Sequence, residues 1–167
     1  MKRGPKAIGT SAETAVVKYA RTYGYPFADR QPLRGNRDAG DITFSPGLIG
    51  EIKGGEQART ASDALILQWL RDTTIERENA NATMALLVVA RWQQPVERWW
   101  AVMWASDLAD LVANTGYDFT PNSVGIPVRL LLRDALTLTR DAGYGDPMPA
   151  ADPALEDGVV ASIREDE

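Results

Sequence analysis

The sequence predicts an α/β (α+β) domain in which a mixed central β-sheet is flanked by helices. Three observations predict this fold class. The 167 residues suffice for one compact domain with a real hydrophobic core. Segments with helical spacing alternate with short apolar, partly β-branched runs. Their order is helix, β-hairpin, helix, strand, strand, helix, which is typical of helices packed on a sheet.

The first expected element is a helix that begins at Thr10 or Ser11 and ends at Gly24, a good C-terminal stop. Apolar residues recur along it at helical spacing, and Glu13 lies three residues after Thr10, where a capping box has its acid. Residues 1–9 before it are expected to form a flexible basic arm.

A β-hairpin is expected next, in the stretch 40–55, GDITFSPGLIGEIKGG, with Pro46 and Gly47 in its turn. A long helix should then run from Thr60 or Ser62 to about Asn79. The later expected elements are a buried strand in 84–92, a returning strand in 99–105, a short helix capped by Ser106, a strand within 124–134 and a final helical piece within 135–145.

Charge is unevenly distributed along the chain. The net charge is −5, but residues 141–167 hold 8 acids and 1 base, whereas residues 1–59 hold 10 bases and 6 acids. Residues 1–140 hold 17 bases and 15 acids and are thus mildly basic. We expect one domain at 10–142 and an acidic, disordered tail at 143–167. This distribution permits a nucleic-acid partner that the overall charge would argue against.

Two residue types are missing, and their absence restricts the possible chemistry. Without cysteine there are no disulfides, thiolate zinc sites or cysteine nucleophiles, which fits a cytoplasmic protein. Without histidine there is no imidazole base and no histidine-ligated zinc. No apolar run is long enough to span a membrane, so no membrane association is expected. Any catalysis must use carboxylates, lysine, hydroxyl groups or a hard metal ion.

The hairpin carries polar residues where an apolar pattern is expected. Because side chains alternate along a strand, Ile49, Glu51 and Lys53 share one face. A loop with an odd number of residues centred on Pro46 would place Asp41 directly across from Glu51, with Cβ atoms roughly 4.5–5.5 Å apart. An even loop would turn Asp41 to the opposite face. The chemistry proposed for this site requires the odd register.

Two adjacent carboxylates repel, so a cation between Asp41 and Glu51 is expected, and Mg²⁺ binds through one or two carboxylates with water and phosphate. Glu13 lies along a mostly apolar helical stripe and also needs a partner. Each residue has an ordinary explanation: Glu13 as a capping residue, Asp41 as a turn residue, and Glu51 with Lys53 as a solvated strand face. Their combination favours a metal site.

Basic residues near this site could hold nucleic-acid phosphates. Arg30, Arg34 and Arg37 precede Asp41 in a glycine-containing loop, and Lys6 lies in the amino-terminal arm. Gln68 on the long helix could also reach the site. The alternatives are an ordinary solvated loop, a basic tail and a helix-surface residue.

The five tryptophans are expected mostly in the core or at an interface. WWAVMW alternates, so one of Trp99 and Trp100 should face outward, which would suit a dimer interface.

An acid on the first helix, then Gly40-Asp41, then Glu51-Ile52-Lys53 after a short hairpin resembles the PD-(D/E)xK nuclease superfamily. Within it, the pattern is most similar to the archaeal-type and phage Holliday junction resolvases. The likeness covers about residues 8–55. Gly40 stands where the superfamily has proline, and the acidic tail has no counterpart in the family pattern.

The resemblance implies a restriction-endonuclease-like fold, a homodimer, branched double-stranded DNA as substrate and Mg²⁺-dependent phosphodiester hydrolysis, with Mn²⁺ able to substitute. Asp41, Glu51 and Glu13 would bind metal, and Lys53 would position or activate the attacking water. Such an enzyme would act in recombination or repair in a bacterial or phage-infected cell. The alternatives are a restriction-like or repair nuclease acting on linear DNA, and a non-catalytic DNA-binding module of the same fold.

Overall fold

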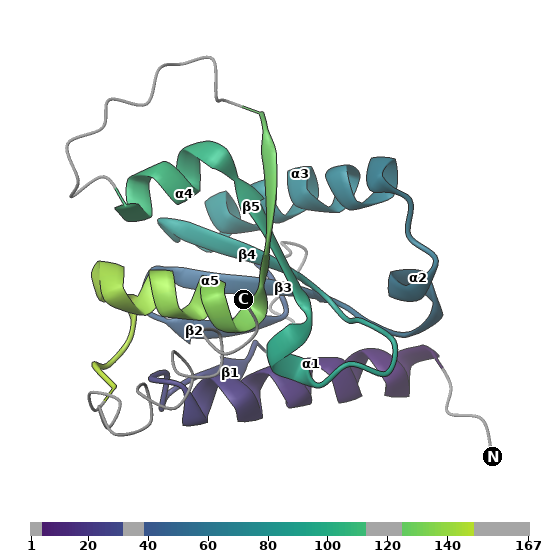
Figure 1. The fold of residues 1–167 in the computed structure, drawn as a ribbon, viewed down its shortest axis with the longest axis horizontal. Helices are drawn as coiled ribbons and strands as arrows, with labels where there is room; N and C mark the ends of the chain where they lie inside the picture. The colour runs from purple at the N-terminus through teal and green to yellow at the C-terminus, as the bar shows by residue number, and fades with distance from the viewer. Residues whose placement is uncertain (1–4, 32–38, 113–124, 149–167) are drawn as a thin grey trace, which may run out of the picture.

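The computed structural model describes residues 5–31, 39–112 and 125–148. It confirms the predicted class: a six-stranded mixed sheet is flanked by helices (Figure 1). In chain order the elements are α1 (Pro5–Thr22), β1 (Asp29–Arg30), β2 (Ile42–Ser45), β3 (Leu48–Lys53), α2 (Gly55–Arg59), α3 (Asp63–Asn79), β4 (Met84–Val89), the 3-10 helix η1 (Val96–Arg98), β5 (Trp100–Trp104), α4 (Ala105–Val112), β6 (Pro127–Leu131), α5 (Leu132–Thr139) and the π-helical turn η4 (Arg140–Tyr144).

The strands lie side by side in chain order, from β1 to β6. Strands β3 and β4 are parallel and are joined by α3, while every other neighbouring pair is antiparallel. A parallel pair requires such a crossover, because its second strand must start again at the same end of the sheet. The carboxyl ends of β3 and β4 therefore lie together, on the side of α2 (Figure 1).

The two faces of the sheet carry separate apolar clusters. Helices α1 and α5 pack on one face, where the fully buried side chains include Val16, Phe44, Leu86 and Leu136. Helices α2 and α3 pack on the other face against alternate residues of β4 and β5. Strand β4 is buried along its whole length, because both of its faces are covered, which explains its continuous apolar sequence.

Of three predicted helix starts, that of α3 is confirmed and those of α1 and α4 are corrected. Helix α1 begins at Pro5 rather than at Thr10 or Ser11, and proline is well tolerated in a first helical turn. Thr10 therefore lies inside the helix and is not the N-cap of a capping box. Ser62 is the N-cap of α3, where its hydroxyl accepts a hydrogen bond from the Leu65 N–H. Helix α4 already begins at Ala105, so Ser106 lies in its first turn and is not its cap.

The hairpin has the predicted register for a reason that the sequence analysis missed. Ile42 pairs with Gly50 and Thr43 with Ile49, which is the alignment of the odd register. The turn itself contains two residues, because Ser45 pairs with Leu48. Phe44 is the extra residue of a β-bulge, and this bulge restores the odd alignment nearer the site.

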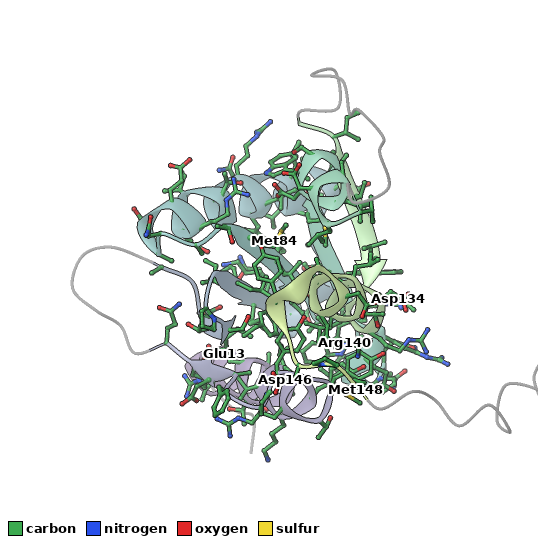
Figure 2. All side chains as sticks on the ribbon, turned by 90° about the vertical axis from the view of Figure 1, so that its left-hand side faces the viewer. Glu13, Met84, Asp134, Arg140, Asp146 and Met148 are labelled. Atoms are coloured by element: carbon green, nitrogen blue, oxygen red, sulfur yellow. The ribbon has the colours of Figure 1, made fainter. Side chains whose placement is uncertain are left out.

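The segment after α5 packs against the domain beyond residue 142, where the tail was expected to begin. The Tyr144 hydroxyl is 2.9 Å from the Thr83 hydroxyl, and the Asp146 N–H donates to the Gly24 carbonyl at 2.7 Å. Asp146 and Met148 lie at the end of the sheet that faces the viewer in Figure 2. The rest of the predicted tail lies outside the described residues.

Among the helices of the described residues, none is both long enough and apolar enough to cross a lipid bilayer.

Candidate active site

Asp41 lies where β2 separates from β3. Gly40 before it has a left-handed φ of 89°, a conformation that glycine adopts without strain. The Asp41 N–H donates to the Gly50 carbonyl at 3.0 Å, and its carboxylate accepts from the Ile52 N–H at 2.8 Å. Asp41 is thus held against β3 by its backbone at Gly50 and by its side chain at Ile52, the two neighbours of Glu51.

Glu51 and Lys53 project from β3 toward α3. Glu51 is only 6% exposed, so the predicted alternative of a solvated strand face is wrong for it. The Lys53 ammonium lies 2.5 Å from a Glu51 carboxylate oxygen and 5.8 Å from the centre of the Trp69 ring on α3. The Lys53 ammonium thus neutralises the buried Glu51 carboxylate and also lies over the Trp69 ring. A buried charge requires a partner of opposite charge of this kind.

The electrostatics of Asp41 reflect this crowding. Burial, followed by the nearby charge of Glu51, raises the pKa of the Asp41 carboxyl to about 7, and the hydrogen bond from the Ile52 N–H only partly offsets these two effects. Glu13 adds a smaller increase. Asp41 and Glu51 therefore repel each other in this structure, as expected for two carboxylates without a cation between them.

Lys53 remains a cation at neutral pH. Burial lowers its pKa, but the hydrogen bond and charge of Glu51, followed by the charges of Asp41 and Glu76, outweigh burial and raise the pKa above its ordinary value. An ammonium with a raised pKa is suited to neutralising phosphate charge and is a poor general base.

Glu13 projects from α1 toward the neighbouring strands and is labelled in Figure 2. Its carboxylate forms an ion pair with Arg30 of β1, with 2.5 Å between Oε2 and Nε. This acid was predicted to need a partner, and that partner is an arginine. Arg30, expected to contact DNA, is thus engaged with Glu13, although its side chain is still 43% exposed.

Of the remaining predicted DNA-binding residues, the structure describes the side chain of Gln68 alone. Gln68 lies on α3 and donates to Asp72 one turn later on the same helix, at 2.9 Å. Lys6 falls within α1, but the structure does not describe its side chain. Arg34 and Arg37 lie outside the described residues.

Sequence reasoning missed one acid near the site. Glu76 of α3 is 7% exposed and contributes to the raised pKa of Lys53. It continues the buried stripe of Ile66, Trp69, Leu70 and Thr73 at helical spacing, and this periodicity could have identified it.

The prediction for the tryptophans holds in part, because Trp69 lies in the core. Trp99 and Trp100 pack partly against opposite faces of the sheet, so neither is the outward-facing ring that was expected. Trp92, in the turn after β4, is 69% exposed. A turn residue does not follow strand alternation, which is why the pattern of WWAVMW could not reveal it.

The donor set is compatible with Mg²⁺ at two of the three predicted ligands. The charge of Glu51 raises the pKa of Asp41, so a cation between the two carboxylates would relieve their repulsion. Hard divalent cations prefer carboxylate oxygens. Within the ranges that the structure describes, however, no three acidic side chains are grouped closely enough to hold a metal ion. Glu13 is paired with Arg30 instead.

The chain matches no protein-family model, no curated protein sequence and no solved structure.

Proposed function

We propose that this protein is a divalent-metal-dependent DNA endonuclease that resolves four-way junctions. The observation that carries the proposal is the position of Asp41 beside Glu51, with a pKa near 7 for Asp41, next to the Lys53 ammonium. A strongly perturbed carboxyl that has a specific charged neighbour is typical of functional sites. The first-helix acid and the Gly-Asp…Glu-x-Lys pattern of the resolvase resemblance supply the reaction class.

Each residue has a role that its surroundings support. Asp41 and Glu51 would hold Mg²⁺, with the Asp41 carboxylate oriented by the Ile52 N–H. Mg²⁺, when bound, would polarise the scissile phosphate and increase the acidity of water. Lys53 would donate hydrogen bonds to a phosphate oxygen as a cation. Glu13 would support the site after exchanging Arg30 for another partner, which would release the arginine for DNA phosphate.

Branched DNA and the homodimer come from the resemblance alone. A junction presents two strands to be cut symmetrically, and a dimer of identical subunits places two identical sites about one two-fold axis. The proposal therefore includes two copies of this chain, each of which would cut one strand.

One observation favours a second candidate, a non-catalytic DNA-binding module. The carboxylates of Glu51 and Glu13 already have cationic partners in Lys53 and Arg30. In a degenerate site, ion pairs of this kind would replace the metal.

A nicking assay separates these possibilities. A four-way junction and a linear duplex of the same sequence are incubated with Mg²⁺ or EDTA, using wild type, Asp41→Asn and the control Asp110→Asn, which removes an exposed charge on α4. Metal-dependent cutting of the junction alone, lost only in Asp41→Asn, is expected. Equal cutting of both substrates would indicate a nuclease of linear DNA, and binding without cutting would indicate the non-catalytic module.

A further inference from the structure

A partly exposed surface of aromatic rings and arginines lies beside the candidate active site. It consists of Arg59 at the end of α2, Arg91 and Trp92 after β4, Trp100 of β5 and Arg129 of β6, and we call it the Trp92 surface. Figure 1 shows α2 at the end of the sheet where the parallel strands β3 and β4 finish. In open sheets, ligands bind outside the carboxyl ends of such strands.

The chain that leads into the Trp92 surface lies beside the backbone of Lys53. The Ala90 N–H donates to the Lys53 carbonyl at 2.8 Å, so the chain that leads into Trp92 is hydrogen-bonded to the last residue of β3. Gly55, which also lines this surface, follows Lys53 by two residues. The hollow beside Trp92 therefore reaches to within two residues of Lys53 along the chain.

Two adjoining hollows share Arg59, Ala90, Arg91, Trp92 and Gln94. One, of about 400 Å³, lies toward α1 and Trp99, and the other, of about 300 Å³, lies toward α3, Trp100 and Arg129. Both are within or near the usual size range of small-ligand sites. The first hollow is lined mostly by apolar atoms, as is typical of such sites, and the second is lined mostly by polar atoms.

The arginines lie over tryptophan rings. The Arg59 guanidinium carbon is 5.8 Å from the centre of Trp92, and that of Arg91 is 4.0 Å from the centre of Trp100, with Arg129 at 5.6 Å from the same ring. Two of these arginines have carboxylate partners: Arg59 pairs with Glu56, and Arg129 pairs with Asp63 at 3.1 Å. Exposed ion pairs of this kind are weak in water, so a phosphate can replace the carboxylate.

The turn that presents Trp92 is strained. Gln93 has a left-handed φ of 56°, which is uncommon for a residue other than glycine. Strain of this type gathers at sites that contact ligands. Here it directly follows an exposed tryptophan. The side chains of Gln93 and Gln94 line the same hollow as Trp92, and an amide can both donate to and accept from the edge of a base.

We infer that the Trp92 surface binds an unpaired nucleobase by stacking it on Trp92, while Arg59 and Arg91 contact the flanking phosphates. Stacking on aromatic rings together with arginine contacts is the recurrent way in which proteins hold single-stranded DNA. This inference rests on the proposed function for its partner, DNA. It adds that the substrate presents at least one base outside the duplex stack, as at a branch point, a flap or a single-stranded end.

Binding to two short labelled oligonucleotides of equal length tests this, one of thymidine nucleotides and one of abasic units with the same phosphates. Fluorescence anisotropy in EDTA and constant salt keeps binding separate from cutting. Wild type should bind the thymidine strand about 5- to 150-fold more tightly than the abasic strand, the range expected for stacking of one base. Trp92→Ala should lose this preference, and Trp92→Phe should keep most of it.

The control is Phe27→Ala. Phe27 is an aromatic residue that is 87% exposed. It lines a small hollow together with Pro46 of the turn before β3, so it lies at the opposite end of β3 from Lys53. Its removal should leave the preference for bases unchanged. Equal binding of both oligonucleotides by wild type would overturn the inference, and so would a Trp92→Ala protein that keeps the preference.

Failure of the inference can be told apart from failure of the proposed function. Metal-dependent cutting with no preference for bases would refute only the inference. A preference for bases that depends on Trp92, without cutting in any divalent metal, would support the inference and refute the nuclease. If Trp92→Ala altered only the oligomeric state, Trp92 would belong to an interface between copies of the chain, and the inference would be wrong.

Discussion

Replacing Asp41 with asparagine should stabilise the metal-free protein at neutral and alkaline pH. The Asp41 pKa is raised to about 7, first by burial and then by the charge of Glu51, from an ordinary value of about 3.9. A carboxyl with a raised pKa favours folding when it is protonated, so its contribution is fully present below about pH 3.9 and is lost as the pH rises through about 7. Asparagine has no charge at any pH and still offers an oxygen to the Ile52 N–H.

The size of the effect follows from the shift in pKa. About three units at about 1.36 kcal/mol each give an upper limit of about 4 kcal/mol. Because the side chain is only partly buried, solvent screening reduces this, and we expect about 2 kcal/mol at about pH 8. Near pH 4 the aspartate and asparagine proteins should differ by less than about 0.5 kcal/mol.

Urea unfolding followed by circular dichroism measures this difference. Wild type, Asp41→Asn and Asp110→Asn are compared in EDTA at about pH 8 and about pH 4, with the control expected to stay within about 0.5 kcal/mol of wild type. The reasoning would be refuted if Asp41→Asn were equally or less stable than wild type at about pH 8, or if its advantage persisted unchanged near pH 4.

Three further substitutions test the structure around the site, each by urea unfolding. Lys53→Met should lower the free energy of unfolding at neutral pH by about 3 kcal/mol, because the buried Glu51 carboxylate loses its ammonium; a loss below about 1 kcal/mol would show that the pair is not buried. Gly50→Ala should cost about 1–3 kcal/mol, since the new Cβ would lie 2.7 Å from a Phe44 ring carbon, and a neutral effect would contradict the packing of the hairpin. Tyr25→Phe should cost about 1–2 kcal/mol, because the buried hydroxyl loses its hydrogen bonds to α5 at 2.6 and 3.0 Å, whereas unchanged stability would mean that water satisfies those α5 groups.

Local patterns predicted the longer helices and strands of the fold but not the short strand β1 or the short helix α2. Ser62 preceded an amphipathic run and caps α3, and the continuous apolar run at 84–89 is a strand with both faces covered. The start of α1 was predicted too late, because Thr10 and Glu13 formed a plausible capping box. The acid at position 13 is instead used in an ion pair with Arg30, a contact between distant positions that no local pattern encodes.

The candidate site could be predicted in its residues but only partly in its geometry. Alternation along β3 placed Glu51 and Lys53 on one face, and the register with β2 was right. The register was right through a bulge at Phe44 that compensates for a two-residue turn, and a bulge depends on packing rather than on turn residues. The Trp92 surface depends on where a turn falls relative to α2, which only the folded chain determines.

Titration calorimetry with Mn²⁺ tests the central claim, that Asp41 and Glu51 form a divalent-cation site, most directly. Wild type, Asp41→Asn and Asp110→Asn are compared at about pH 8, where the Asp41 carboxyl is mostly ionised, and near pH 6, where it must release a proton to bind metal. The account predicts saturable binding by wild type and the Asp110→Asn control that weakens toward pH 6, and little or no binding by Asp41→Asn. Equal binding by all three proteins, or none by wild type at either pH, would contradict it.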